Sequence, residues 1–183
     1  MESASALLLS MLKEKYDFEM DRKKSYDESV STPITLVSFL VAGIFYSLID
    51  DDMIDLNQHM EFARIAILLP MGFFCILTFI KLHEVYVSTN VYYKSFPSTK
   101  DVISDYKNLA DYKEVKGPDE SKPLEELFTE NMIDWYQDCN EQNCKSNDIR
   151  MNALYQSKSL IGIAFIFGII LTIFIGLVKS DIL

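Results

Sequence analysis

The chain has 183 residues, of which 49% are hydrophobic, and a formal net charge of −10. This combination is unusual for a soluble domain, and the excess of acidic residues argues against an extended nucleic-acid-binding face. The apolar residues are clustered, because Asp, Glu, Lys and Arg are absent from 33–49, 65–80 and 159–178.

The three uncharged runs predict membrane-spanning helices. A helix needs about 20 residues to cross the hydrocarbon core of a bilayer. The run 159–178 has this length, and the other two reach it when flanking residues that can snorkel, such as Lys81, are included. We therefore predict an all-α membrane protein with three transmembrane helices.

Residues 1–32 predict an N-terminal helix on the cytoplasmic side, with polar residues of both signs. Pro33 then falls in the first turn of the next helix, where a proline is tolerated. The sequence leaves two roles open for the N-terminal helix. It packs on the rest of the cytoplasmic part, or it contacts anionic lipid through Arg22, Lys23 and Lys24.

Residues 33–82 predict a transmembrane hairpin with an outer loop at 50–63. The loop is acidic and has no Lys or Arg. Its acidity is explained either by the usual exclusion of basic residues from outer loops or by a ring of carboxylates that concentrates cations at the mouth of an oligomeric pore. The candidate pore-mouth residues are Asp50, Asp51, Asp52 and Asp55.

Residues 83–158 predict a cytoplasmic helical region. A short helix is expected at about 101–115, followed by a loop at 116–123 that contains Gly and two prolines. A long helix then begins near Leu124 and runs into the last span, with a break near 140–147 left open. A polar stripe on this helix gives the candidate residues for binding a ligand or partner, which are Asn140, Asn143, Asn147 and Arg150.

Residues 159–183 predict the third transmembrane helix and a short outer tail. Small residues recur in it at every fourth position, which keeps them on one side of a helix. In lipid, small residues allow two helix backbones to approach closely. The candidate residues for packing in a homo-oligomer are Ala164, Gly168, Thr172 and Gly176. The same row is also suited to docking against the chain's own hairpin.

The distribution of basic residues predicts the orientation. Lys and Arg number five in 1–32, none in 50–63, ten in 81–158 and one after residue 178. Because basic residues are enriched on the cytoplasmic side, we expect the N-terminus and 83–158 inside and the C-terminus outside.

Motifs that would indicate catalysis are missing from the sequence, which has no glycine-rich phosphate loop, G-x-S-x-G, H-E-x-x-H or C-x-x-C. Its two histidines, His59 and His83, fall on opposite sides of the membrane in this topology. A zinc site would need clustered ligands. We therefore expect no catalytic residues, no metal site and no cofactor, and we expect that the protein is not an enzyme.

Two stretches have a helix of mixed charge that runs into an apolar span. They are YDFEMDRKKSYDESVSTPITLVSFLVAG (16–43) and NDIRMNALYQSKSLIGIAFIFGI (147–169). This layout resembles small bacterial membrane effectors of antiviral, abortive-infection systems, among them SLATT-type effectors and Hailong-type channel effectors. The resemblance implies a multi-pass protein of the bacterial inner membrane. It also implies that the membrane part permeabilises the membrane when a cytoplasmic protein partner or nucleotide-type ligand signals infection.

The sequence therefore supports two functional hypotheses. The first is an oligomeric membrane channel or pore-forming effector gated by its cytoplasmic helices. Three spans are too few to enclose a wide pathway in one chain, so such a conduit requires a homo-oligomer. The second is a membrane-anchored adaptor, or an accessory subunit of a larger complex, that binds a cytoplasmic protein without conducting ions.

Overall fold

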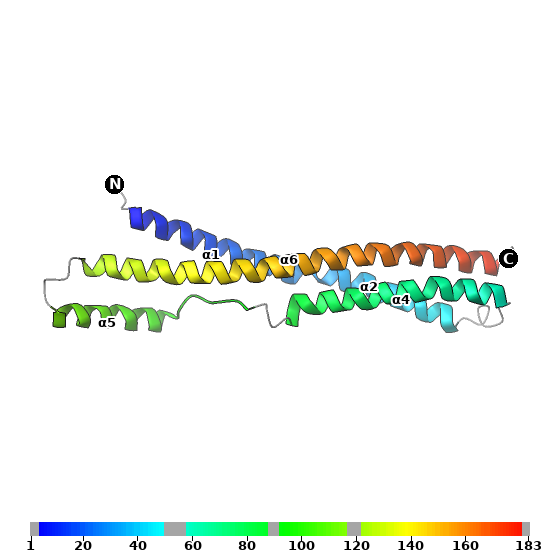
Figure 1. The fold of residues 1–183 in the computed structure, drawn as a ribbon, viewed down its shortest axis with the longest axis horizontal. Helices are drawn as coiled ribbons and strands as arrows, with labels where there is room; N and C mark the ends of the chain where they lie inside the picture. Colours follow the sequence, from blue (N-terminus) through cyan, green and yellow to red (C-terminus); the bar gives the residue numbers. More distant parts are fainter. Residues whose placement is uncertain (1–3, 50–57, 88–91, 117–121, 181–183) are drawn as a thin grey trace. The chain divides into compact units, whose positions relative to one another are not determined.

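The computed structural model describes residues 4–49, 58–87, 92–116 and 122–180. The regular secondary structure in these residues is entirely α-helical (Figure 1), which confirms the predicted fold class. The helices are α1 (Ala4–Ser29), α2 (Ser31–Ile49), α4 (Gln58–Val87), α5 (Thr99–Lys116) and α6 (Leu124–Lys179).

The helix ends follow local sequence signals. Before α5, the Ser98 hydroxyl accepts a hydrogen bond from the Asp101 backbone N–H at 3.3 Å, and the Asp101 carboxylate accepts one from the Ser98 N–H at 3.2 Å. This reciprocal pair is a capping box. Helix α6 has Glu125 and Glu126 in its first turn and Lys179 in its last, which suits the helix dipole. It continues without a break through 140–147.

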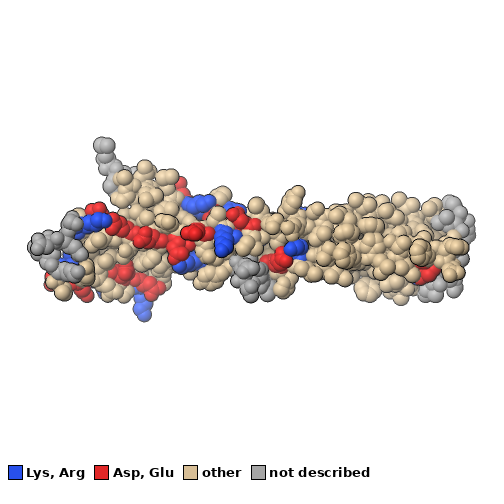
Figure 2. Space-filling model, in the orientation of Figure 1, with Lys and Arg blue, Asp and Glu red and all other residues tan. Residues whose placement is uncertain are grey.

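Three helical stretches are long and apolar enough to cross a membrane, which confirms the predicted number of spans. They are Ala4–Ile49, which joins α1 and α2, then Gln58–Tyr86 and Leu124–Lys179. Pro33 lies in the first turn of α2, as the sequence predicts. On the face drawn in Figure 2, charged side chains gather over part of the surface and leave a long stretch nearly free of them.

The chain divides into two compact units, each built from two separate segments. The polar unit comprises Met1–Lys24 and Asn90–Asp148, and the apolar unit comprises Ser25–Thr89 and Ile149–Leu183. Both α1 and α6 contribute residues to both units.

The apolar unit packs α2, α4 and the last part of α6 around a common core. Val37 and Leu40 of α2, Met71 of α4 and Ile161 and Ala164 of α6 are among its buried residues. A second cluster joins Val30, Leu82, Val85, Ala153 and Leu154. Side chains thus fill the space between these three helices.

Buried residues in the apolar unit recur at alternating steps of three and four. On α4 they are Arg64, Leu68, Met71, Cys75, Thr78, Leu82 and Val85. From the start of α2 they are Pro33, Val37 and Leu40, and then Ser47, which follows Leu40 by seven residues. Ile44, at the position between them, is only partly buried. This is the seven-residue repeat of left-handed helix bundles, in which every helix keeps one face toward its neighbours.

The outer faces of the same helices are also apolar. Phe39 of α2 is 70% exposed, and Phe62 and Leu69 of α4 are 75% and 68% exposed. Exposure of such large apolar side chains is costly in water and favourable in lipid. The arrangement is therefore that of a bundle with lipid around it.

Candidate functional site

The four residues proposed to bind a ligand lie on the buried face of α6. Asn143 and Asn147 are fully buried, and Asn140 and Arg150 are nearly so. One row of buried positions on α6 recurs at steps of three and four, and the four candidate residues occupy consecutive positions of that row. The row consists of Tyr136, Asn140, Asn143, Asn147, Arg150, Leu154, Ser157, Ile161 and Ala164. Cys139, Ser146, Ala153 and Leu171 of α6 are also buried.

In the polar unit, Asn143 pairs with an extended segment at residues 92–98, which we call the strap. Its side-chain amide donates to the Lys94 carbonyl at 3.1 Å, and its carbonyl accepts from the Lys94 backbone N–H at 2.8 Å. One turn along α6, the Ser146 hydroxyl donates to the Tyr92 carbonyl at 2.6 Å. Side chains of α6 therefore hold the strap through hydrogen bonds to its backbone.

Aromatic side chains hold the other end of the strap. The Phe96 ring stacks on Tyr136 with centroids 4.3 Å apart and meets the edge of Trp135 at 5.9 Å. The Phe96 backbone N–H also donates to the Tyr16 hydroxyl of α1 at 3.3 Å. The strap thus contacts both α1 and α6.

Asn147 joins α1, α6 and the strap. Its amide donates to the backbone carbonyl of Glu19 at 2.7 Å and to the Glu19 carboxylate at 2.9 Å. Its carbonyl accepts from the Tyr93 hydroxyl at 2.5 Å. Asn140 makes a further link, donating to the Leu12 carbonyl of α1 at 2.8 Å. Three asparagines therefore tie α1, α6 and the strap together.

Glu19 is a fully buried carboxylate surrounded by donors. Lys15 lies 2.7 Å from one of its oxygens, and Arg22 lies 2.9 Å from the other. Burial alone raises the pKa of the Glu19 carboxyl. The hydrogen bonds from Lys15 and Asn147 and the charge of Arg22 outweigh that effect, so its pKa lies below the ordinary value. The carboxylate is therefore ionised at neutral pH.

Arg150, the fourth candidate residue, belongs to the apolar unit instead. Its guanidinium forms an ion pair with Asp27 and lies over the Tyr26 ring, 6.0 Å from the centroid. The structure therefore separates Arg150 from the cluster of three asparagines, although all four share one face of α6.

The candidate ligand residues are all engaged within the chain, and binding of a ligand or partner by them stays a prediction. A ligand that used them would have to replace internal contacts. Sequence reasoning missed Glu19, Tyr93 and Ser146 as members of this network. Glu19 had a detectable signal, because Lys15 and Arg22 lie four residues before and three residues after it on one helix face.

The small-residue row of α6 divides into two halves. Ala164 is fully buried in the core of the chain. A Cβ atom at Gly168 would lie 3.0 Å from the Leu40 side chain, so Gly168 permits close approach of α2. Thr172 and Gly176 are exposed, and a Cβ at Gly176 would meet nothing within 4 Å. The first half therefore packs within the chain, and only the second half is open to another molecule.

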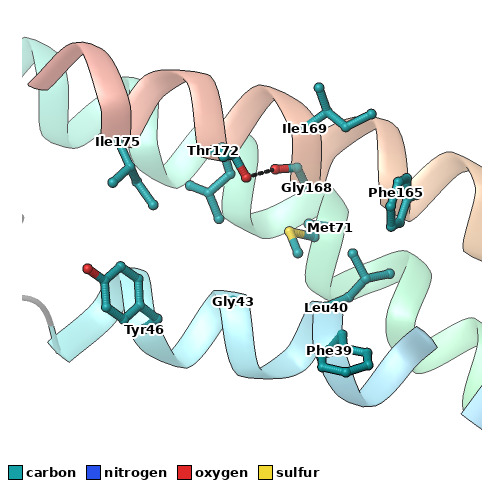
Figure 3. A pocket seen from close by; sticks show the side chains of 11 residues that line it. Phe39, Leu40, Gly43, Tyr46, Met71, Phe165, Gly168, Ile169, Thr172 and Ile175 are labelled. Atoms are coloured by element: carbon teal, nitrogen blue, oxygen red, sulfur yellow. Dashed lines mark hydrogen bonds between the residues drawn. The ribbon is translucent and has the colours of Figure 1, made fainter. Parts of the chain in front are cut away.

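An apolar groove of about 410 Å³ lies between α2 and α6 beside this row (Figure 3). Gly43 on α2 and Gly168 and Thr172 on α6 lie along it, with Phe39 and Tyr46 on its α2 side. The Thr172 hydroxyl donates to the Gly168 carbonyl at 2.9 Å, so its hydrogen bond is made within α6. The groove consequently presents an apolar surface.

The proposed pore-mouth residues Asp50, Asp51, Asp52 and Asp55 lie outside the described residues. The hairpin end beside them is held by Arg64, which is largely buried. Its guanidinium donates to the Ser47 carbonyl at 3.0 Å and to the Glu61 carboxylate at 2.6 Å. Arg64 thereby fastens the last turn of α2 to the first turns of α4.

In comparisons with known proteins, no family model, curated protein or solved structure matches this chain. Among the residues that the structure describes, no group of three or more His, Cys, Asp or Glu is placed to hold a metal ion.

Proposed function

We propose that the protein is an oligomeric membrane channel or pore-forming effector whose conduit forms between copies. The observation that carries this proposal is the filled core of the apolar unit together with the open groove on its surface. Met71 and Ala164 are almost completely buried between the helices. An ion pathway would therefore have to form between chains and not through the core of one chain. The groove beside Gly43 and Thr172 is a surface on which a second copy can pack closely.

The polar unit is the proposed gate. The network of Glu19, Asn147 and Tyr93 connects α1, α6 and the strap, and α6 continues from there into the third span. A cytoplasmic protein partner or a nucleotide-type ligand would shift the gate by binding one arrangement of this unit better than another. Asn140, Asn143, Asn147 and Arg150 are the proposed residues that change contacts in that step.

The setting we propose follows from the resemblance to bacterial antiviral effectors. The protein would lie in the bacterial inner membrane with its N-terminus inside and its C-terminus outside. Infection would open the channel, and ion flow would arrest or kill the cell. The acidic loop residues Asp50, Asp51, Asp52 and Asp55 would favour cations at the outer mouth.

A membrane-anchored adaptor is the second candidate function, and one observation favours it. Large apolar side chains on α1 are exposed in the polar unit, among them Leu7, Leu8, Met11 and Phe18. An exposed apolar stripe outside the membrane spans is a common feature of protein-binding surfaces. In this alternative, α1 binds a cytoplasmic protein and the three spans serve as an anchor.

Conductance of the purified full chain in a planar bilayer tests the channel proposal. We expect cation-selective currents, and we expect that replacing Asp50, Asp51 and Asp52 together by Asn lowers cation selectivity without changing the oligomer. Replacing the exposed Glu141 by Gln removes a carboxylate elsewhere and serves as the control. Silent bilayers, with verified insertion and with candidate partner or nucleotide both present and absent, would leave the adaptor as the better explanation.

A further inference from the structure

The apolar unit has a second groove, of about 440 Å³, between the first turns of α2 and the middle of α6. Thr32 and Leu36 of α2 and Lys158, Gly162 and Phe165 of α6 are among its lining residues. We propose that this groove binds a phospholipid with an anionic headgroup, with one acyl chain in the groove and the phosphate at Lys158.

The groove has polar and apolar ends in the order that a phospholipid requires. Thr32 and Lys158 immediately precede the uncharged runs of α2 and α6, so they lie where each helix enters the hydrocarbon. Leu36 and Phe165 lie further along the same helices, with Phe165 about 10 Å beyond Lys158 at 1.5 Å per residue. The cationic end thus lies at the headgroup level and the apolar end within the hydrocarbon.

Gly162 keeps the groove open. A Cβ atom at this position would meet nothing within 4 Å, so no other side chain of the described chain fills the space. Leu36 and Phe165 are exposed at the side of the bundle that faces the surrounding lipid. An acyl chain can therefore enter sideways from the bilayer.

The charge at the groove distinguishes it from a neighbouring one. Within the part of the chain that the structure describes, Lys158 has no ion-pair partner. A third groove, between α4 and α6, includes Lys81 and Tyr155, but the Lys81 ammonium donates to both Glu84 oxygens at 3.0 and 2.9 Å. Basic pockets between membrane helices bind anionic headgroups, and of these two lysines only Lys158 has an uncompensated charge.

A lipid fits this groove better than a second copy of the chain does. Copies inserted in the same direction hold Lys158 at the same depth, so a symmetric interface here would bring like charges together. It would also take the ammonium out of water without an anionic partner, which is unfavourable. An anionic headgroup supplies that partner, and its acyl chain covers the apolar surface.

Native mass spectrometry of the detergent-purified full chain tests this proposal, with phosphatidylglycerol and phosphatidylcholine added as probes. We expect one retained phosphatidylglycerol per chain, with a preference of about fivefold over phosphatidylcholine, as expected for one lysine near an anionic headgroup. Lys158→Gln should bring the preference to about one. Lys81→Gln should leave it unchanged, because Glu84 already neutralises that lysine.

A second pair of variants tests whether the groove itself holds the lipid. Gly162→Leu should fill the groove and abolish retention of both lipids, while Gly176→Leu, outside the groove, should not. Protection of the buried Cys75 thiol shows whether each variant is folded. The proposal is overturned if Lys81→Gln lowers the preference as much as Lys158→Gln does. It is equally overturned if folded Gly162→Leu keeps its lipid, or if that variant changes only the number of associated copies.

Discussion

Asn143 shows how one side chain can replace a strand partner. Its amide group faces the backbone of Lys94 and satisfies both the N–H and the carbonyl of that residue. A segment with no regular structure of its own is otherwise left with backbone groups that need partners when buried. Asn143, together with the Ser146 hydroxyl on the Tyr92 carbonyl, therefore explains why residues 92–98 lie extended against a helix.

Replacing Asn143 by Leu should release the strap. The leucine has a similar size but cannot pair with Lys94, and leaving those backbone groups unsatisfied costs about 1–3 kcal/mol. We expect faster hydrogen–deuterium exchange across residues 92–98. Lys145→Leu places the same side chain on the exposed face of the same helix and should not change that exchange. Unchanged exchange in Asn143→Leu would show that other contacts hold the strap.

Glu19 predicts a dependence of stability on pH. Its pKa in the folded protein is lowered, so its ionised form stabilises the fold above the ordinary glutamate pKa of about 4.3. That contribution is lost as the pH falls through the lowered value. Glu19→Gln should therefore destabilise the polar unit by about 1–3 kcal/mol at pH 7, and the difference from wild type should shrink below about pH 4.

Chemical denaturation followed by the fluorescence of Trp135, the single tryptophan, measures this difference at each pH. Glu14→Gln is the matched control, because Glu14 is exposed on the same helix. If the difference in free energy of unfolding between Glu19→Gln and the wild type stays constant down to strongly acidic pH, the role assigned to the buried carboxylate is contradicted.

At the level of elements, the seven-residue repeat decides which face of each helix is buried. On α2 the repeat is apolar as far as Leu40, whereas on α6 Asn140, Asn143 and Asn147 occupy three consecutive positions of it and Leu154, Ile161 and Ala164 occupy later ones. One helix can thus pack in both units with a single spacing. Its buried residues are mostly hydrogen-bonding ones in the polar unit and mostly hydrophobic ones after Arg150.

Substitutions in the small-residue row of α6 distinguish packing within the chain from packing between chains. Gly168→Leu should lower the free energy of unfolding by about 1–3 kcal/mol, because the added side chain overlaps Leu40 and Met71. Gly176→Leu should leave the fold intact, since the position is open. Heat-dependent labelling of the buried Cys75 thiol, in a background with Cys139 and Cys144 replaced by Ser, measures both.

The oligomeric state of the Gly176→Leu variant then tests the exposed half of the row. A shift to smaller species in detergent, with Cys75 still protected, would place Gly176 between copies. If the Cys75 thiol is as protected from labelling in the Gly168→Leu variant as in the wild type, then close approach of α2 and α6 is not required for the fold.

The helices and spans could be predicted because uncharged runs, prolines and caps are local features of the sequence. Which face of each helix is buried could not be predicted from the sequence. In the spans every face is apolar, so hydrophobicity does not mark the side that faces Met71 or Ala164. In the polar unit the buried positions of α6 include three asparagines, which a hydrophobic pattern assigns to the surface. Their partners lie far away in sequence, as Leu12 does for Asn140.

At the scale of the whole molecule, orientation is the property on which the functional proposals most depend. The candidate gate must lie on the side where a cytoplasmic signal arrives, and the acidic loop must lie on the opposite side. Five basic residues lie in 1–32, before the first span, and ten lie in 81–158, between the second and third spans. Only Lys179 follows the third span. A difference of this size is a strong determinant of insertion.

Single cysteines on either side of the predicted third span test this orientation. In a chain with Cys75, Cys139 and Cys144 replaced, Ser180→Cys and Lys145→Cys each place a thiol at an exposed position. A maleimide that cannot cross the inner membrane should label Ser180→Cys in intact spheroplasts and should label Lys145→Cys only after the membrane is permeabilised, because the basic residues hold residue 145 inside. The opposite result would mean that the protein is inserted in the reverse orientation, with the candidate gate outside the inner membrane. Equal labelling of both positions in intact spheroplasts would mean that α6 does not cross the membrane, and a conduit formed between its copies would then be untenable.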